Sequence, residues 1–285
     1  MKKLTLVIAI FTAMLFAACG NKTNADNSGQ DSDTVVKSFE QQQIEASVKM
    51  QLDSIAAEIS SKKFTPLYQA INNGEITLSA DEKKVKPDYL LAPSAANDVQ
   101  TILQKYAAFS FLTTDRAVAK LYDMDTKDYD AAISKLLADI NDPALEKLQD
   151  KGTFQQIEKE IYEMEEKSGR IHFFWTATCA ATVEQLYVAS QNSDKFLQGY
   201  DDEAVANITF RIVLILDAID RLSVYDAEIQ GLAEAVQPLK KINAVTVEDL
   251  KKELAEINME FSQKYAGSIM AHPEEGIKEC NTKCF

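Results

Sequence analysis

Residues 153–189, TFQQIEKEIYEMEEKSGRIHFFWTATCAATVEQLYVA, form the longest stretch of the chain that keeps a single helical phase. Apolar or small side chains recur in it every three or four residues, which places them on one face of a helix. Thr153 and Gln156 fit the capping box that opens many helices. The residues that share the phase are Phe154, Ile157, Ile161, Met164, Ile171, Trp175, Thr178, Thr182, Leu186 and Ala189.

Ser168 and Gly169 interrupt this run near its middle. Met164 and Ile171 are nevertheless seven residues apart and remain on the same side of a continuous helix. We therefore expect one long helix that tolerates the glycine at a cost of about 1 kcal/mol. A break into two helices at this point is the alternative.

The rest of the chain from residue 34 to about 270 shows the same kind of periodicity. Helices are expected over about 34–62, 93–121, 126–140, 203–230 and 246–270, with a short one after Asp142-Pro143. The 203–230 helix is the most apolar and is expected to be central. Its polar groups, Asn207, Arg211, Asp217 and Asp220, argue against a membrane span. The sequence predicts an all-α fold, a multi-helix bundle of about six substantial helices with crossover connections.

Residues 64–93 are the least regular part of the predicted domain. They contain Pro66, the turn-like Asn72-Asn73-Gly74, Pro87 and Pro93. We expect mostly loop there, with at most one helical turn. A loop of this length is a candidate for function, but a strap that crosses over the helices is the preferred interpretation because reactive side chains do not cluster in it.

The N-terminal residues 1–20, MKKLTLVIAIFTAMLFAACG, have the three parts of a secretory signal: a basic start, a short apolar core and small residues before a cleavage point. The apolar core is too short to span a bilayer, which takes roughly 20 residues. Ala17-Ala18-Cys19 then resembles the lipobox of bacterial outer-membrane lipoproteins, with Phe16 where that pattern has an aliphatic residue.

The resemblance implies that residues 1–18 are removed as a signal peptide and that Cys19 becomes the acylated first residue, carrying a diacylglyceryl group and an N-acyl chain such as palmitate. Two or more chains anchor a protein stably. Gly20 and Asn21 follow the cysteine without an aspartate, which in lipoprotein sorting implies the outer membrane, at its periplasmic face or at the cell surface. Residues 19–33 would be a flexible tether and 271–285 a tail. The alternative is a secreted protein from which Cys19 is trimmed.

Two internal blocks resemble uncharacterised helical lipoproteins of gut Bacteroidota: residues 86–94, KPDYLLAPS, and residues 115–124, DRAVAKLYDM. This resemblance implies an envelope location and carries no activity or catalytic residue with it.

The charge of the chain limits its partners. The formal net charge is −14, and loss of residues 1–18 with their two lysines makes it −16. Nucleic acids and anionic membrane surfaces bind through clustered basic groups. We therefore expect no nucleic-acid partner, and attachment to the membrane only through the lipid anchor.

Three cysteines remain beside Cys19. Cys280 and Cys284 could form a disulfide in an exported protein if a turn brings them together, and the alternative is two thiols on a tail. Cys179 lies among alanines and threonines and is read as a buried small residue. Two thiols and a distant histidine fall short of a zinc site, so neither a metal nor a cofactor is predicted.

The search for catalytic groups is mostly negative. His172 and His272 are the only histidines. His172, Phe174 and Trp175 form an aromatic patch that could bind a ligand, although core packing is the preferred interpretation. Six charged residues could supply paired carboxylates or a buried charge network between central helices, but salt bridges are more usual at such spacing: Asp115, Arg116, Arg211, Asp217, Asp220 and Arg221. No catalytic residue is assigned.

Two functional classes remain. The preferred one is a non-enzymatic helical binding or accessory module that contacts another envelope protein or a small ligand. The alternative is a carboxylate-dependent hydrolase of envelope or extracellular polymers. A cleft lined by carboxyl groups of raised pKa would favour the hydrolase.

Overall fold

The computed structural model describes residues 39–62, 65–147, 154–224 and 226–257. The described residues from 43 to 257 form one compact unit. Over the described ranges the protein is all-α, as predicted, and has no strand. The predicted signal and lipid site at Cys19, the Cys280 and Cys284 pair, and His272 lie outside the described residues.

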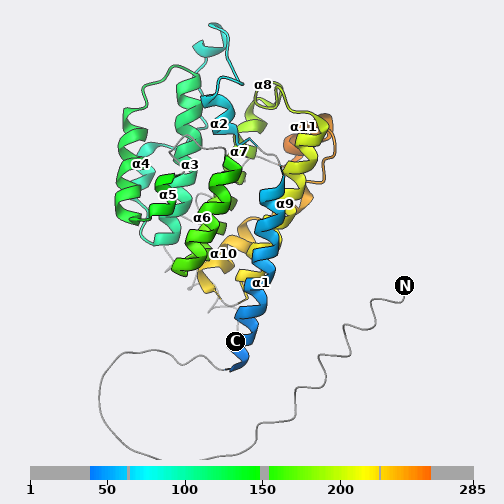
Figure 1. The fold of residues 1–285 in the computed structure, drawn as a ribbon. Coiled ribbons are helices and arrows are strands. Elements are labelled where there is room, and N and C mark those ends of the chain that lie inside the picture. The colour runs from blue at the N-terminus through cyan, green and yellow to red at the C-terminus, as the bar shows by residue number, and fades with distance from the viewer. Residues whose placement is uncertain (1–38, 63–64, 148–153, 225, 258–285) are drawn as a thin grey trace, which may run out of the picture. The chain divides into compact units, whose positions relative to one another are not determined.

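In the described ranges, eight helices have seven residues or more (Figure 1): α1 (Phe39–Ser61), α3 (Ile102–Leu121), α4 (Lys127–Ile140), α6 (Phe154–Ser168), α7 (Ile171–Gln191), α9 (Asp202–Leu222), α10 (Ala227–Ala235) and α11 (Val247–Glu256). Shorter elements connect them: α2 (Leu67–Asn72), α5 (Pro143–Lys147), α8 (Ser193–Phe196) and the 3₁₀ turns η1 (Glu82–Lys84), η2 (Pro93–Asn97) and η3 (Gln237–Lys241).

The expected long helix over 153–189 is wrong, because the chain breaks at Gly169. This glycine has φ +75°, a left-handed conformation that ends a helix and suits a residue without a Cβ. The Arg170 N–H then donates to the Glu165 carbonyl at 2.8 Å, which closes the last turn of α6. The expected 203–230 helix divides too, since α9 ends at Leu222 and α10 begins at Ala227. These two divisions turn the six predicted helices into eight.

Capping side chains explain where several helices begin. Thr101 and Gln104 form a capping box, so α3 begins at Ile102 and not at Pro93 as predicted; Pro93 opens the 3₁₀ turn η2 instead. Asp201 and Thr246 cap the starts of α9 and α11, where their side chains accept backbone N–H groups at 2.8 Å and 3.1 Å. The predicted capping residue Thr153 and the end of the 246–270 helix fall outside the described ranges.

The central helix is α7 and not α9. Helix α7 packs against α3, α6, α9 and α11. Its buried residues are mostly small or apolar and lie around most of its circumference. By contrast, α9 leaves Val213 52% and Phe210 37% exposed, so the apolar surface that predicted a central position is partly in contact with solvent. No described helix is long and apolar enough to cross a membrane.

Helix α3 separates two apolar clusters. One face, including Phe111 and Val118, joins the large cluster built with α1, α7 and α9. The opposite face, including Phe109 and Leu112, joins a smaller cluster with α4 and η2. The helix is therefore buried on both sides, and the boundary between the clusters runs along it.

Candidate functional site

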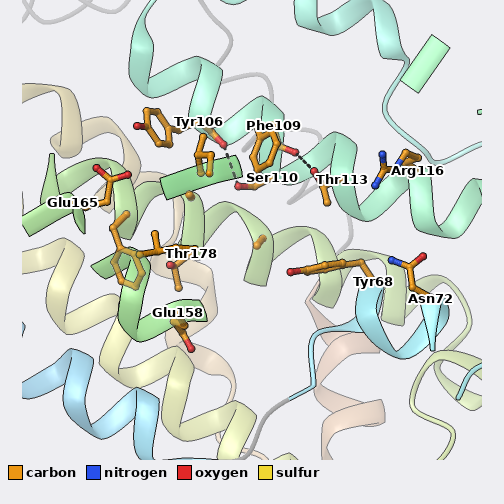
Figure 2. A pocket seen from close by; sticks show the side chains of 15 residues that line it. Tyr68, Asn72, Tyr106, Phe109, Ser110, Thr113, Arg116, Glu158, Glu165 and Thr178 are labelled. Carbon is orange, nitrogen blue, oxygen red and sulfur yellow. Dashed lines mark hydrogen bonds between the residues drawn. The ribbon is translucent and has the colours of Figure 1, made fainter. Parts of the chain in front are cut away.

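A cavity of about 250 Å³ lies along α3, bounded by α2, α6 and α7 (Figure 2). From α3 the cavity is lined at spacings of three and four residues, from Tyr106 through Phe109 to Arg116. Ten residues of helix rise about 15 Å, so the cavity is long and narrow. Its volume suits a metabolite better than a drug-sized ligand, which usually occupies a pocket of about 300–1,000 Å³.

The cavity sits where the two apolar clusters meet. Tyr106 and Phe109 belong to the smaller cluster, and Ile161 and Phe174 to the larger one. Helix α7 presents small side chains to this space, namely Ala177, Thr178 and Ala181. Large residues on three helices opposite small ones on the fourth leave a gap that side chains do not fill.

Two hydroxyl groups on the α3 wall already use their hydrogens. Ser110 donates to the Tyr106 carbonyl at 3.1 Å, and Thr113 donates to the Phe109 carbonyl at 2.7 Å. Their oxygens keep lone pairs and can accept hydrogen bonds. This wall therefore offers acceptors to a ligand.

The two ends of the cavity differ in charge. Figure 2 shows Arg116 and Asn72 at one end, and Glu158 and Glu165 toward the other. Arg116 is paired with Asp130 of α4, with 3.0 Å between Nη1 and Oδ1. One end therefore holds a basic group that is already neutralised, and the other end is acidic.

Glu158 at the acidic end is held by an arginine. Arg211 of α9 reaches across and donates two hydrogen bonds to the Glu158 carboxylate, of 2.8 Å and 3.1 Å, and both side chains are about 3% exposed. Such a bidentate pair fixes both groups. Glu158 is thus a neutralised part of the wall.

Glu165, two turns further along α6, is different. Its side chain is 1% exposed, and neither carboxyl oxygen makes a hydrogen bond of ordinary geometry to any residue in the described part of the chain. Burial raises its pKa to about 9, and the neighbouring Asp142 carboxylate contributes to the rise. At neutral pH Glu165 therefore carries a proton.

Asp142, which caps α5, is the ionised partner in this acid pair. Burial would raise its pKa, but the neighbouring Glu165, the Tyr106 hydroxyl, the Ala144 N–H and the Arg170 guanidinium together lower the pKa below its ordinary value. Tyr106 donates a hydrogen bond to Oδ2, the Ala144 N–H donates to Oδ1 at 2.8 Å, and Arg170 lies 3.3 Å from Oδ2. Of the two acids, Asp142 is therefore the ionised one and Glu165 carries the proton.

The predicted aromatic patch is split by the structure. Phe174 lines the cavity. Trp175 is fully buried in the larger cluster, with Phe174 edge-on at 5.1 Å between ring centroids. His172 is half-buried and its ring lies 3.9 Å from that of Phe173. Of the three residues only Phe174 contributes to the site.

Salt bridges hold most of the charged residues considered from the sequence, and Asp115 lies beside a second buried acid, Glu184. Asp217 pairs with Arg221 at 3.0 Å, Asp220 with Lys240 at 3.0 Å, and Arg116 with Asp130. Asp115 is buried under the chain before α3, where its Oδ2 accepts the Leu91 N–H at 2.8 Å. Salt bridges and structural contacts account for these residues.

The sequence analysis missed Glu165 and Asp142. A signal for Glu165 existed: Glu158, Ile161 and Glu165 follow spacings of three and four, so both acids share a face with a buried isoleucine. An acid on an apolar face is buried and needs a partner. Asp142 was read only as a helix cap, and its spatial neighbour could not be deduced from its position in the chain.

Within the described ranges no group of three or more metal-binding side chains could hold a metal ion. No protein-family model, no curated protein and no solved structure matches this chain. The function is therefore inferred from the geometry of the site and from the sequence.

Proposed function

We propose that this protein is a lipid-anchored module of the cell envelope that binds a small molecule in the cavity between α3, α6 and α7. The lipobox ending at Cys19 supports the anchor in the outer membrane. The cavity supports binding, because it combines mostly apolar walls with a few polar groups at defined places. The observation that carries the proposal is the buried Glu165 carboxyl group at one end of this cavity.

A hydrolase is the second candidate, favoured by the raised pKa of Glu165, since a protonated carboxyl group can act as a general acid. Hydrolysis would also require a base or nucleophile. Asp142 is engaged by Tyr106 and Arg170, and Glu158 by Arg211. Among the described carboxylates of this site neither is available to activate water, so we rank binding above catalysis.

Native mass spectrometry of the protein, extracted gently from its own membranes, tests the proposal. The expected result is an added mass of a small molecule that dissociates at raised collision energy. Replacing Ala177 with phenylalanine fills the cavity from the α7 side and should abolish this added mass.

Two outcomes oppose the proposal in different ways. An added mass that persists in Ala177→Phe would show that the ligand binds elsewhere. Wild-type protein with no added mass, together with turnover of a glycan or ester substrate that Glu165→Gln removes, would favour the hydrolase.

A further inference from the structure

Two carboxyl groups, Glu158 and Glu165, line the acidic end of the cavity, and the Asp142 carboxylate lies beside Glu165. Arg211 neutralises Glu158, and Arg170 contacts Asp142. Glu165 has no arginine or lysine within 4 Å among the described residues. Of these three acids only Glu165 lacks a paired cation, and its proton keeps it neutral.

The groups around Glu165 come from every element packed against it. Asp142 precedes α5, Tyr106 belongs to α3, and Arg170 lies between α6 and α7. Ser168, on the same helix, donates its hydroxyl hydrogen to the Glu165 carbonyl at 3.0 Å. None of these groups gives the Glu165 carboxylate a counter-ion of its own.

The remaining cavity wall suits a cation. Aromatic rings from three elements line it, contributed by Tyr68, Tyr106, Phe109 and Phe174, and aromatic rings attract organic cations within about 6 Å. The net charge of −14 also raises the local concentration of cations around the protein. An anion would meet the Glu158 and Glu165 carboxyl groups at the acidic end and, at the other end, an arginine that Asp130 already neutralises.

We propose, on the basis of the binding function above, that the cavity takes a small organic ammonium ion whose charge pairs with Glu165. The Glu165 oxygens are covered by neighbouring side chains, so the ligand meets them after rotation about the Glu165 side-chain bonds. Glu165 gives up its proton to solvent when the ammonium ion binds, and the ammonium ion replaces that proton as the charge partner of the carboxylate. A neutral ligand would leave the proton in place.

Isothermal titration calorimetry with 2-phenylethylammonium and its neutral analogue 2-phenylethanol tests this inference. For the ammonium ion, we expect release of about one proton per molecule bound at pH 7, seen as a dependence of the measured heat on the buffer. Its affinity should rise about tenfold per pH unit from about pH 6 to about pH 8, because the proton on Glu165 competes with the ligand. The alcohol should show neither effect.

Glu165→Gln keeps the shape of the side chain and removes its ionisation. This variant should lose about 10- to 100-fold in affinity for the ammonium ion and lose the proton release, while circular dichroism confirms its fold. Ala177→Phe should lose binding of both probes.

The outcomes separate the two proposals. Binding of the ammonium ion without proton release, or with equal affinity in Glu165→Gln, would overturn the ammonium inference and leave a ligand-binding cavity. Failure of the ammonium ion to bind would also overturn it. A native ligand that is found by mass spectrometry and proves to be neutral would do the same while supporting the proposed function.

Discussion

The Arg211 guanidinium of α9 holds the Glu158 carboxylate of α6 through two hydrogen bonds, and both side chains are almost completely buried. This pair ties a wall of the cavity to the larger apolar cluster. Breaking a buried pair leaves an uncompensated charge, which costs about 3–5 kcal/mol.

We therefore expect Arg211→Met to lower the free energy of unfolding, measured by urea denaturation, by about 3–5 kcal/mol. Replacing Arg211 and Glu158 together by methionine should cost less than Arg211→Met alone. The control is the exposed pair Lys240 and Asp220, where Lys240→Ala should cost less than about 1 kcal/mol. Equal losses of unfolding free energy in Arg211→Met and Lys240→Ala would contradict the claim that burial makes the Arg211 pair the more important one.

The pH dependence of stability reports on Glu165. Its pKa in the folded protein, about 9, lies above the ordinary value of 4.5, so the folded protein keeps a proton that the unfolded chain releases. The stabilising contribution of this proton is present below about pH 4.5 and is lost as the pH rises toward 9. Glu165→Gln should remove this loss and be more stable than wild type at pH 8 to about 9, by urea denaturation across pH.

The exposed Glu163 on the same helix supplies a matched control. Glu163→Gln should change stability by less than about 0.5 kcal/mol and leave the pH profile unchanged. A Glu165→Gln profile parallel to that of wild type would contradict the placement of the proton.

Replacing glycine with alanine should have opposite effects on stability at Gly169 and at Gly231. Gly169 has φ +75°, so Gly169→Ala should destabilise the protein by about 1–2 kcal/mol. Gly231 lies inside α10 with nothing near the position of an added Cβ, so Gly231→Ala should stabilise by about 0.5–1 kcal/mol. Thermal unfolding of both variants measures this difference, and shifts of the same sign would contradict it.

Asp115 attaches the chain before α3 to the core. Its Oδ2 accepts the Leu91 N–H at 2.8 Å, and Tyr129 donates to the Leu91 carbonyl at 2.9 Å. Burial, and then the nearby Glu184, raise the pKa of Asp115. Asp115→Ala should cost about 1–3 kcal/mol and speed hydrogen exchange at the Leu91 amide.

Asp115→Asn keeps the acceptor, so its exchange rate at Leu91 should stay close to that of wild type. Equal acceleration in the two variants would show that the carboxyl group does not hold this segment.

This arrangement also gives physical meaning to the two sequence blocks that resemble Bacteroidota lipoproteins. Residues 86–94 carry Leu91, and residues 115–124 carry Asp115, and the hydrogen bond between them joins the blocks. The Lys86 ammonium group also donates to the Tyr122 carbonyl. In this protein the blocks therefore build one structural contact, which fits the expectation of a strap over the helices.

The lipid anchor remains a prediction from residues 1–20. Cys19→Ala should move the protein from the membrane fraction to the soluble fraction, because the acyl chains supply the attachment. Fractionation followed by a carbonate wash measures this, with Cys179→Ala as the control. Retention of Cys19→Ala in the membrane after the wash would contradict the anchor.

The all-α fold could be predicted because helical periodicity records burial directly. The two helix breaks could not, since the phase of the apolar residues continues across Gly169 while the backbone turns away. The prediction that the 203–230 helix is central was wrong because the number of apolar residues in a helix does not show how many other helices pack against it. Helix α7 is covered by several helices, whereas α9 leaves Val213 exposed.

The candidate site was less predictable still. Glu165 could have been noticed as an acid on an apolar face. Its role in the site, however, depends on Asp142, which is distant in the chain, and on the arginines that neutralise the neighbouring acids. The cavity itself arises from the small residues of α7 opposite α3. Such a match between two helices is decided by packing and is not visible in either helix alone.

A crystal structure of the protein purified from its own membranes would show directly whether the cavity holds a ligand. We predict density for a small molecule along α3, in contact with Phe109 and Thr178 and ending at Glu165. Ordered water alone in this space, with the added mass of a ligand traced to another surface, would contradict it.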